Sequence, residues 1–415
     1  MQPVRRQLFD DAAEFAVELA CLRPVLTANL DDRTGFSRLL DYGQPAAEPA
    51  LEPAPDAVGS PLDAEDLRTR VHKVLEEFLA RQGGVLDAVS PDCAPMIEYV
   101  GDLMRGGKRL RPAFCYWGWR AAGAPDGEAI LRAASSLEFF QAAALVHDDV
   151  MDDSDTRRGA PAVHRRFTAL HGDRGWAGDA GRFGLAGAVL AGDLCLVWSD
   201  ELFTASGLDA VALGRGRGVF DRMRTELMGG QYLDMLEQVL ASRRPEGALE
   251  RARRVIRYKS AKYTVEHPLL LGGRLAGADD DLLTAYSAFG LPLGEAFQLR
   301  DDVLGVFGDP SETGKPAGDD LREGKRTVLV AKALENASPA QAELVARRLG
   351  DPHLDAAGVE ALREVIVETG ALASVESLVE ELVDRSLAAL ATAAVDAPAR
   401  AVLTGLVTAA TVRAS

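Results

Sequence analysis

The sequence predicts an all-α protein, a single large helical bundle with a central apolar channel. Long segments carry apolar residues at three- and four-residue spacings, which is the pattern of amphipathic helices. Alternating strand patterns are nearly absent, and the helical segments are too many and too long for a doubly wound sheet. Apolar residues make up 47% of the 415-residue chain and charged residues 26%, so a sizeable core can form.

The first 62 residues are expected to form an extension outside the helical domain, which we place at 63–415. The spacing of Ala, Phe, Val and Leu indicates one short helix over 8–26. Between Tyr42 and Leu62 five prolines remove backbone donors and favour extended conformations. We interpret this second stretch as a Pro-rich linker.

The helical domain opens with a complete helix signature. Pro61 follows the capping-type Ser60, acids crowd the next turn, and an apolar stripe runs over 71–79. We expect this helix to end at the glycine pair Gly83 and Gly84. Further helices are predicted over 129–151, 187–204, 211–239, 249–271, 280–306, 328–334, 339–348 and 358–393.

Charge and cysteine content restrict the partners and the compartment. The net charge is −17, and such a surface repels nucleic acid and anionic lipid, so we expect no nucleic-acid partner. Four scattered cysteines lack the spacing of a zinc site or a disulfide framework. The start has no signal-peptide core, and the apolar runs 135–146 and 183–198 are shorter than the ~20 residues of a membrane span. We therefore expect a cytoplasmic protein without a transmembrane segment.

A first acidic motif, Asp148, Asp149 and Asp152, ends the apolar helix predicted over 129–151. Four-residue spacing places Asp148 and Asp152 on one helix face, with Asp149 beside them, at the mouth of the channel. Like charges at this spacing destabilise a helix, and acids at its C-terminal end oppose the helix dipole. The motif therefore calls for a compensating cation, and Mg²⁺ held by carboxylates and phosphate oxygens is the natural candidate.

A second acidic motif, Asp301 and Asp302, stands late in the apolar helix predicted over 280–306. One such helix end is most simply a solvated acidic surface, but two in one bundle are seldom a coincidence. If they face one another, they would clamp a diphosphate through several metal ions. Basic segments around Lys108 and Arg111, at Arg157 and Arg158, and near Lys259 and Lys325 would complete two anion pockets.

These motifs, in this order and spacing, resemble those of the trans-isoprenyl diphosphate synthases, most closely the geranylgeranyl diphosphate synthase type. The resemblance runs from about Leu67 to the C-terminus. It is carried by GGKRLRP (106–112), DDVMD (148–152), FQLRDD (297–302) and GKPAGDDLREGK (314–325). It implies the isoprenoid synthase fold, a homodimer, and a prenyltransferase that condenses isopentenyl diphosphate with an allylic diphosphate using Mg²⁺, about three ions per site.

The resemblance also implies residue roles. The two acidic motifs would hold Mg²⁺ and, with Lys259, form the catalytic set. Isopentenyl diphosphate would be held by Lys108, Arg111 and Arg158, together with Gln141, which stands where many relatives have histidine. The allylic diphosphate would be surrounded by Arg157, Lys259, Ser260, Gln298, Lys315 and Lys325. A second departure is Gly305, which occupies the usual place of a third aspartate in the second acidic motif.

Product length is expected to depend on side chains below the first acidic motif. In the family, bulky residues four or five positions before the motif stop the growing chain early. Here Ala144 and Ala143, about 6 and 7.5 Å below Asp148, are small, which disfavours a fifteen-carbon product. Phe139 and Phe140 lie one turn deeper and would form an aromatic floor, which favours a twenty-carbon product.

Other functions remain open at this stage. A longer-chain polyprenyl or a farnesyl diphosphate synthase would use the same motifs. A terpene cyclase would not need Lys108 and Arg111, and a His-Asp phosphohydrolase built on His147 and Asp148 would need further histidines, of which the chain has six in all. An inactive partner subunit would more often have lost an acidic motif.

Overall fold

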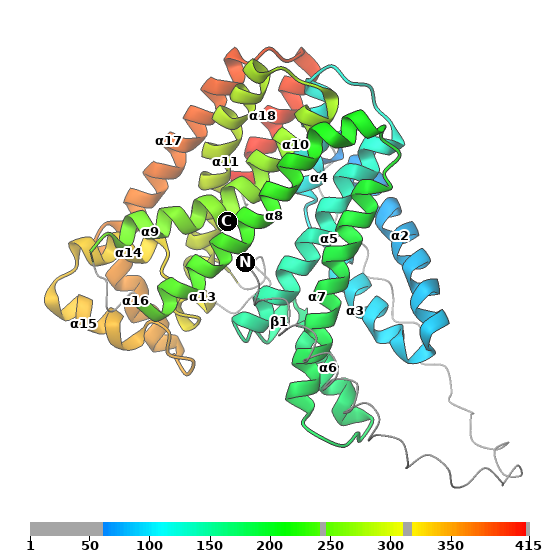
Figure 1. The fold of residues 1–415 in the computed structure, drawn as a ribbon. Coiled ribbons are helices and arrows are strands. Elements are labelled where there is room, and N and C mark those ends of the chain that lie inside the picture. The colour runs from blue at the N-terminus through cyan, green and yellow to red at the C-terminus, as the bar shows by residue number, and fades with distance from the viewer. Residues whose placement is uncertain (1–60, 241–245, 310–317, 412–415) are drawn as a thin grey trace, which may run out of the picture. The chain divides into compact units, whose positions relative to one another are not determined.

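The computed structural model describes residues 61–240, 246–309 and 318–411. Helices make up nearly all of this part of the chain, and one hairpin of two-residue strands is its only sheet, so the predicted all-α class is confirmed (Figure 1). The proposed extension and linker over 1–62 lies outside the described residues apart from Pro61 and Leu62, and the domain boundary stays a prediction.

The elements run in the following order: η1 (Pro61–Asp66), α2 (Leu67–Val89), η2 (Pro91–Cys93), α3 (Ala94–Arg105), α4 (Leu110–Ala121), α5 (Glu128–Met151), β1 (Thr156–Arg157), β2 (Ala160–Pro161), α6 (Val163–Asp173), α7 (Ala180–Thr204), α8 (Ala210–Leu240), α9 (Ala248–Val255), the π-helical η4 (Ile256–Glu266), α10 (His267–Ala276), α11 (Asp280–Phe307), α13 (Asp319–Arg322), α14 (Val328–Asn336), α15 (Pro339–Arg348), α16 (Ala356–Glu368), α17 (Ala371–Thr392) and α18 (Ala397–Thr411).

Helix α5 lies at the centre of the larger of two apolar cores. It packs along α7, as Figure 1 shows, and also contacts α4 and α2. Glu138, buried near the middle of the helix, forms an ion pair with the buried Arg109. Because most of its length is enclosed, the acids at its C-terminal end emerge from an apolar interior.

Helix α11 joins the two cores. Its first half, including Tyr286 and Phe289, belongs to the larger core, and its second half, including Leu299 and Val306, belongs to the C-terminal core with α14, α16 and α17. The second acidic motif lies in this second half. Packing on both sides therefore fixes the depth at which those two carboxyl groups lie.

Several predicted helix limits are wrong, among them the start of α7, which lies at Ala180 rather than at 187. Helix α2 continues through Gly83 and Gly84 to Val89, because a helical glycine costs only about 1 kcal/mol and α2 packs against η1, α3 and α5. The segment 249–271 is three elements, with η4 between α9 and α10. The segment 358–393 is broken at Gly370, whose φ of +74° ends one helix and begins another. Helices α3, α4, α6, α13 and α18 were not predicted.

Two glycines make room for the wide η4 segment. A Cβ atom on Gly230 of α8 would lie 2.4 Å from the backbone nitrogen of Lys259. A Cβ atom on Gly294 of α11 would lie 2.5 Å from the carbonyl oxygen of Ala261. The backbones of three elements thus approach closely, and η4 is held between α8 and α11.

Two described helices, α5 and α7, are long and apolar enough to cross a membrane by length and composition. Both helices are longer than the apolar runs 135–146 and 183–198 that they contain. The expectation that these parts of the chain are too short to span a membrane is therefore wrong as regards length. In α5, 72% of the apolar window is buried inside the protein, as in a core helix. In α7 only 28% is buried, which leaves an apolar face uncovered.

A prediction follows from the crossing of α4 and α10. A Cβ atom on Gly272 would lie 1.9 Å from the carbonyl oxygen of Cys115. Gly272→Ala should therefore lower the free energy of unfolding by about 1–3 kcal/mol, because the two backbones must separate. Gly214→Ala on α8 is the control, since a Cβ atom there meets nothing within 4 Å and should stabilise the helix by up to about 1 kcal/mol. Urea denaturation of both variants measures the difference, and equal stabilities would contradict this packing.

Candidate active site

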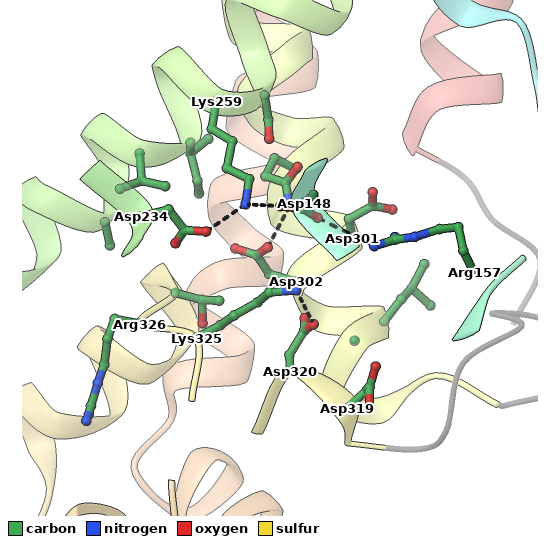
Figure 2. A pocket seen from close by; sticks show the side chains of 18 residues that line it. Asp148, Arg157, Asp234, Lys259, Asp301, Asp302, Asp319, Asp320, Lys325 and Arg326 are labelled. Atoms are coloured by element: carbon green, nitrogen blue, oxygen red, sulfur yellow. Dashed lines mark hydrogen bonds and ion pairs between the residues drawn. The ribbon is translucent and has the colours of Figure 1, made fainter. Parts of the chain in front are cut away.

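Asp148 of the first acidic motif and both acids of the second line one polar pocket of about 330 Å³, whereas Asp149 and Asp152 do not line it. Asp148 reaches it from α5, Asp301 and Asp302 from α11, and Lys259 from η4 (Figure 2). Lys325, just after α13, completes the ring of charge. Segments more than 150 residues apart in the sequence thus meet at one site, as expected if the two acidic motifs face one another.

Asp148 is held between several donors. Its carboxylate accepts hydrogen bonds from Lys259 Nζ at 3.1 Å and from Gln231 Nε2 at 3.0 Å, and it lies 3.5 Å from Arg157 Nη2. Burial alone would raise the pKa of Asp148, but Lys259, Lys325 and Arg157 outweigh it and hold the pKa at about 2. Asp148 is therefore an anion throughout the physiological pH range.

The other two acids of the first motif have different surroundings. Asp149 is buried and forms an ion pair with Arg157, whose Nε also donates to it at 2.8 Å. No cation among the described residues forms an ion pair with Asp152, and burial together with the charge of Asp148 raises its pKa to about 6. In the first motif, Asp149 thus forms an ion pair with Arg157, and Asp148 is strongly ionised. Asp152 is the acid whose charge is least compensated by the described residues.

Among the described residues, Asp302 of the second acidic motif is similarly short of positive charge. Burial raises the pKa of Asp302 well above its ordinary value, and the neighbouring Asp320 and Asp301 raise it further. Gln298 Nε2 donates a hydrogen bond to Asp302 at 2.8 Å. Lys325 is bound instead to Asp320, at 3.1 Å, and to Glu323.

The donor set fits Mg²⁺ bound together with a diphosphate. Within the described residues, no three His, Cys, Asp or Glu side chains already form a cage that would hold a metal alone. Mg²⁺ is usually bound by one or two carboxylates plus substrate phosphates rather than by an all-protein cage. The raised pKa values of Asp152 and Asp302 mark the two places where added positive charge would be most stabilising.

A second, apolar cavity of about 480 Å³ adjoins the polar pocket. Ala144, Leu145 and Val150 of α5 line it, with Leu227 and Met228 of α8 opposite. The residues shared by both cavities are Asp148, Lys259, Ser260, Gln298 and Asp301. A molecule with a charged head and an apolar tail could therefore occupy both at once.

Of the residues expected around isopentenyl diphosphate, two line the apolar cavity. Gln141 accepts a hydrogen bond from the hydroxyl of Tyr263 at 2.5 Å. Arg111 donates to Thr264 Oγ1 at 2.8 Å and lies 4.1 Å above the ring of Tyr263.

The other two expected residues, Lys108 and Arg158, line neither cavity in the described structure. Arg158 donates to the carbonyl oxygens of Leu103 and Gly106 at 2.6 and 2.8 Å. Lys108 donates to the carbonyl oxygen of Ala409 at 3.3 Å. Lys315, expected at the allylic diphosphate, lies outside the described residues.

The expected chain-length residues divide between cavity and core. Ala144 lines the apolar cavity, whereas Ala143 is fully buried and does not. Phe140 packs edge-on against Tyr263, with ring centroids 5.5 Å apart, and so lies directly behind a cavity-lining ring. Phe139 packs instead against Phe78, in the core.

Sequence reasoning gave no role to several residues that the structure brings to the site. Asp234 accepts a hydrogen bond from Lys259 Nζ at 2.6 Å, and Gln231 contacts Asp148. Both belong to one segment of α8, four and one residues after Gly230. Tyr263 and Asp320 also received no role, although Asp320 lies within the GKPAGDDLREGK segment (314–325) that carries the resemblance.

Comparisons with known proteins agree with this geometry. Residues 93–366 match the polyprenyl synthetase family. The geranylgeranyl diphosphate synthase of Saccharolobus solfataricus is 32% identical over 263 residues, which are 63% of this chain and 73% of the relative. The octaprenyl diphosphate synthase of Escherichia coli is 31% identical over 304 residues, 72% of this chain and 84% of the relative.

A solved structure is similar over almost its whole length. The geranylgeranyl pyrophosphate synthase of Corynebacterium glutamicum, crystallised with isoprenyl diphosphate and magnesium, is 40% identical, with a TM-score of 0.79. The alignment covers 83% of this chain and 98% of that one. Sequence motifs, fold and family match all agree, and the chain belongs to the polyprenyl synthetase family.

Proposed function

We propose that this prenyltransferase is a Mg²⁺-dependent geranylgeranyl diphosphate synthase that joins isopentenyl diphosphate to an allylic diphosphate. The observation that carries the proposal is the polar pocket between two acidic motifs, which adjoins an apolar cavity beside the small Ala144. The allylic diphosphate head would lie in the pocket and its hydrocarbon tail in the cavity. Similarity to geranylgeranyl diphosphate synthases supports the same product.

The residues of the pocket have complementary roles in this reaction. Mg²⁺, bound by the two acidic motifs, would stabilise negative charge on the departing diphosphate. Lys259 and Arg157 orient Asp148 and balance part of its charge. The bond between the allylic carbon and the diphosphate oxygen breaks, and the apolar cavity keeps water from the allylic cation.

Isopentenyl diphosphate would approach from the side of Arg111 and Gln141, which line the apolar cavity. Its double bond attacks the allylic cation, a new carbon–carbon bond forms, and one proton leaves. The released diphosphate would take that proton, so no protein nucleophile is needed. Asp148, with its pKa at about 2, would remain ionised and would not take the proton.

A longer-chain product is the second candidate. Val189 and Met228 line the apolar cavity and are also 44% and 43% exposed, so that wall reaches the protein surface. A growing chain could pass between them. The aromatic pair of Phe140 and Tyr263 favours the twenty-carbon product, because it blocks the direction along α5.

A homodimer is the third part of the proposal. Most of the exposed large apolar side chains among the described residues belong to α7 and α8, and we call this set the α7–α8 apolar face. Its members are Phe183, Leu185, Val189, Leu190, Val197, Val211, Met228, Tyr232, Met235 and Val239. A patch of this kind marks an interaction site, and a second copy would bury it symmetrically. We propose this in preference to a membrane contact because Asp193, 60% exposed, lies within the same stretch of α7.

The proposed reaction is tested with purified protein, Mg²⁺, isopentenyl diphosphate and each allylic primer, with products read by mass spectrometry. Asp148→Asn should lower kcat by about 10²–10³-fold without loss of helix content, because it removes charge and leaves shape. Asp384→Asn, an exposed change on α17, is the matched control. Unchanged turnover in Asp148→Asn, or no product from the wild type, would reject the assignment.

The raised pKa of Asp152 predicts a pH dependence of stability. With a folded-state pKa of about 6, above its unfolded value, this carboxyl group stabilises the metal-free protein at low pH and loses that effect as pH rises through 6. Asp152→Asn should therefore raise Tm in EDTA at pH 7.5, and the gain should shrink toward pH 5. The exposed Asp153→Asn is the control. A gain independent of pH would contradict the assigned environment of Asp152.

Product length gives a further prediction. Ala144→Phe places a ring in the apolar cavity and should shorten the main product toward fifteen carbons. Phe140→Ala removes the ring behind Tyr263 and should lengthen it. Val367→Phe, on the exposed side of α16, should leave the product unchanged. If neither cavity variant alters the mass distribution, the end of the channel lies elsewhere.

The homodimer is tested by light scattering at micromolar concentration. Leu190→Asp, at a side chain 57% exposed on the α7–α8 apolar face, should convert the dimer to a monomer, because the buried charge would lack a partner. Val367→Asp, at 53% exposure away from this face, should remain dimeric. A monomeric wild type would exclude the dimer.

A further inference from the structure

The loop 106–109 joins α3 to α4 and carries Lys108, and Arg111 follows it in the first turn of α4. The backbone of this loop enters the left-handed region twice, with φ of +109° at Gly107 and +57° at Arg109. Residues other than glycine seldom adopt the second value, and they keep it only where surrounding contacts hold them. The conformation of the loop therefore depends on what the side chain of Arg109 binds.

Arg109 binds two groups inside the protein. Its guanidinium is 6% exposed, and Nη1 forms an ion pair with Glu138 of α5, which is 5% exposed. Nη2 donates a hydrogen bond to the carbonyl oxygen of Met104, in the last turn of α3. A planar guanidinium can make both contacts at once, which a lysine ammonium on its flexible stem cannot reproduce. Arg109 thus fastens the loop to α5 and to the end of α3.

A second guanidinium contacts the same loop. Arg158 Nη1 donates to the carbonyl oxygens of Leu103 and Gly106 at 2.6 and 2.8 Å. A Cβ atom on Gly107 would lie 2.9 Å from Arg158 Nη2, so this glycine lets the arginine pack on the backbone. The carbonyl groups at the end of α3, which lack helical partners, are thereby bound by arginines.

Glu138 supplies negative charge where these basic side chains gather. Burial lowers the pKa of Arg158, and the charge of Glu138 opposes that shift. Arg109 and Arg111 lower the same pKa further, so the three arginines repel one another at short range. A buried carboxylate beside them lets the group stay together before an anionic substrate binds.

Arg109 itself is not placed to bind substrate, because it is buried and both of its terminal nitrogens bind protein groups. We propose that Arg109 and Glu138 are positioning residues for isopentenyl diphosphate. Their ion pair fixes the loop 106–109 and so sets where Lys108 and Arg111 present their charges to the diphosphate of that substrate. This inference rests on the proposed function, from which it takes the substrate.

The test compares the KM of the two substrates at saturating Mg²⁺. Arg109→Lys keeps the charge and loses one of two contacts, whereas Glu138→Gln keeps the shape and loses the charge. Each should raise the KM for isopentenyl diphosphate by about 10–100-fold, the effect of losing a hydrogen bond to a charged group. The KM for the allylic diphosphate and kcat should stay near the wild-type values, because neither residue lines the polar pocket.

The matched control is Glu65→Gln, because Glu65 forms an ion pair with Arg120 at the other end of α4. It should leave both KM values unchanged. The double variant Arg109→Met with Glu138→Gln should raise the KM for isopentenyl diphosphate by less than the product of the two single effects, since the residues act as one unit. Circular dichroism reports whether each variant folds, and Arg109→Lys decides the test if Glu138→Gln does not.

Two results would overturn the inference while leaving the synthase function intact. One is an unchanged KM for isopentenyl diphosphate in the folded single variants. The other is an equal rise in the KM of both substrates, which is the result expected if the ion pair only supports the fold. A wild type that makes no prenyl product from the two diphosphates would reject the proposed function and this inference together.

Discussion

The structure depends on keeping several carboxylates close together in a partly buried site. Like charges repel strongly where water is scarce, so such a group is stable only with cations between its members. Lys259 lies between Asp148 and Asp234, and Arg157 binds Asp149. These cations come from η4 and from β1, which ties both elements to the end of α5. The compensation is incomplete at Asp152 and Asp302, and that deficit is what a metal–diphosphate complex would supply.

Close backbone approach is the second requirement, because it sets where those cations lie. Gly230 allows α8 to touch η4 at Lys259, and Gly192 of α7 leaves room for His147, whose Nε2 would lie 2.1 Å from a Cβ atom there. Gly305 does the same for Asp320. Each glycine lies beside a polar group of the site, so the packing of the helices and the placement of charge are fixed by the same contacts.

Much of the fold could be predicted because the helices are strongly periodic. The limits of α8 and α11 fell within one residue of those observed. Errors occurred where local preference was outweighed by packing: Gly83 and Gly84 lie inside α2, and a π-helical segment interrupts a stretch that reads as one helix. The short α4 was missed because it is buried on almost all sides and carries no amphipathic pattern.

The sequence alone determined the class of the protein, the two acidic motifs and the basic residues that accompany them, because like charges at helical spacing need a counter-ion wherever the helix lies. It could not determine which cation meets which acid, since that depends on contacts between distant segments. Only the tertiary structure placed Arg111 and Gln141 in the apolar cavity and left Lys108 and Arg158 outside its lining. Only the tertiary structure set Asp320 against Gly305, because no local pattern links two positions on different helices whose side chains compete for one volume.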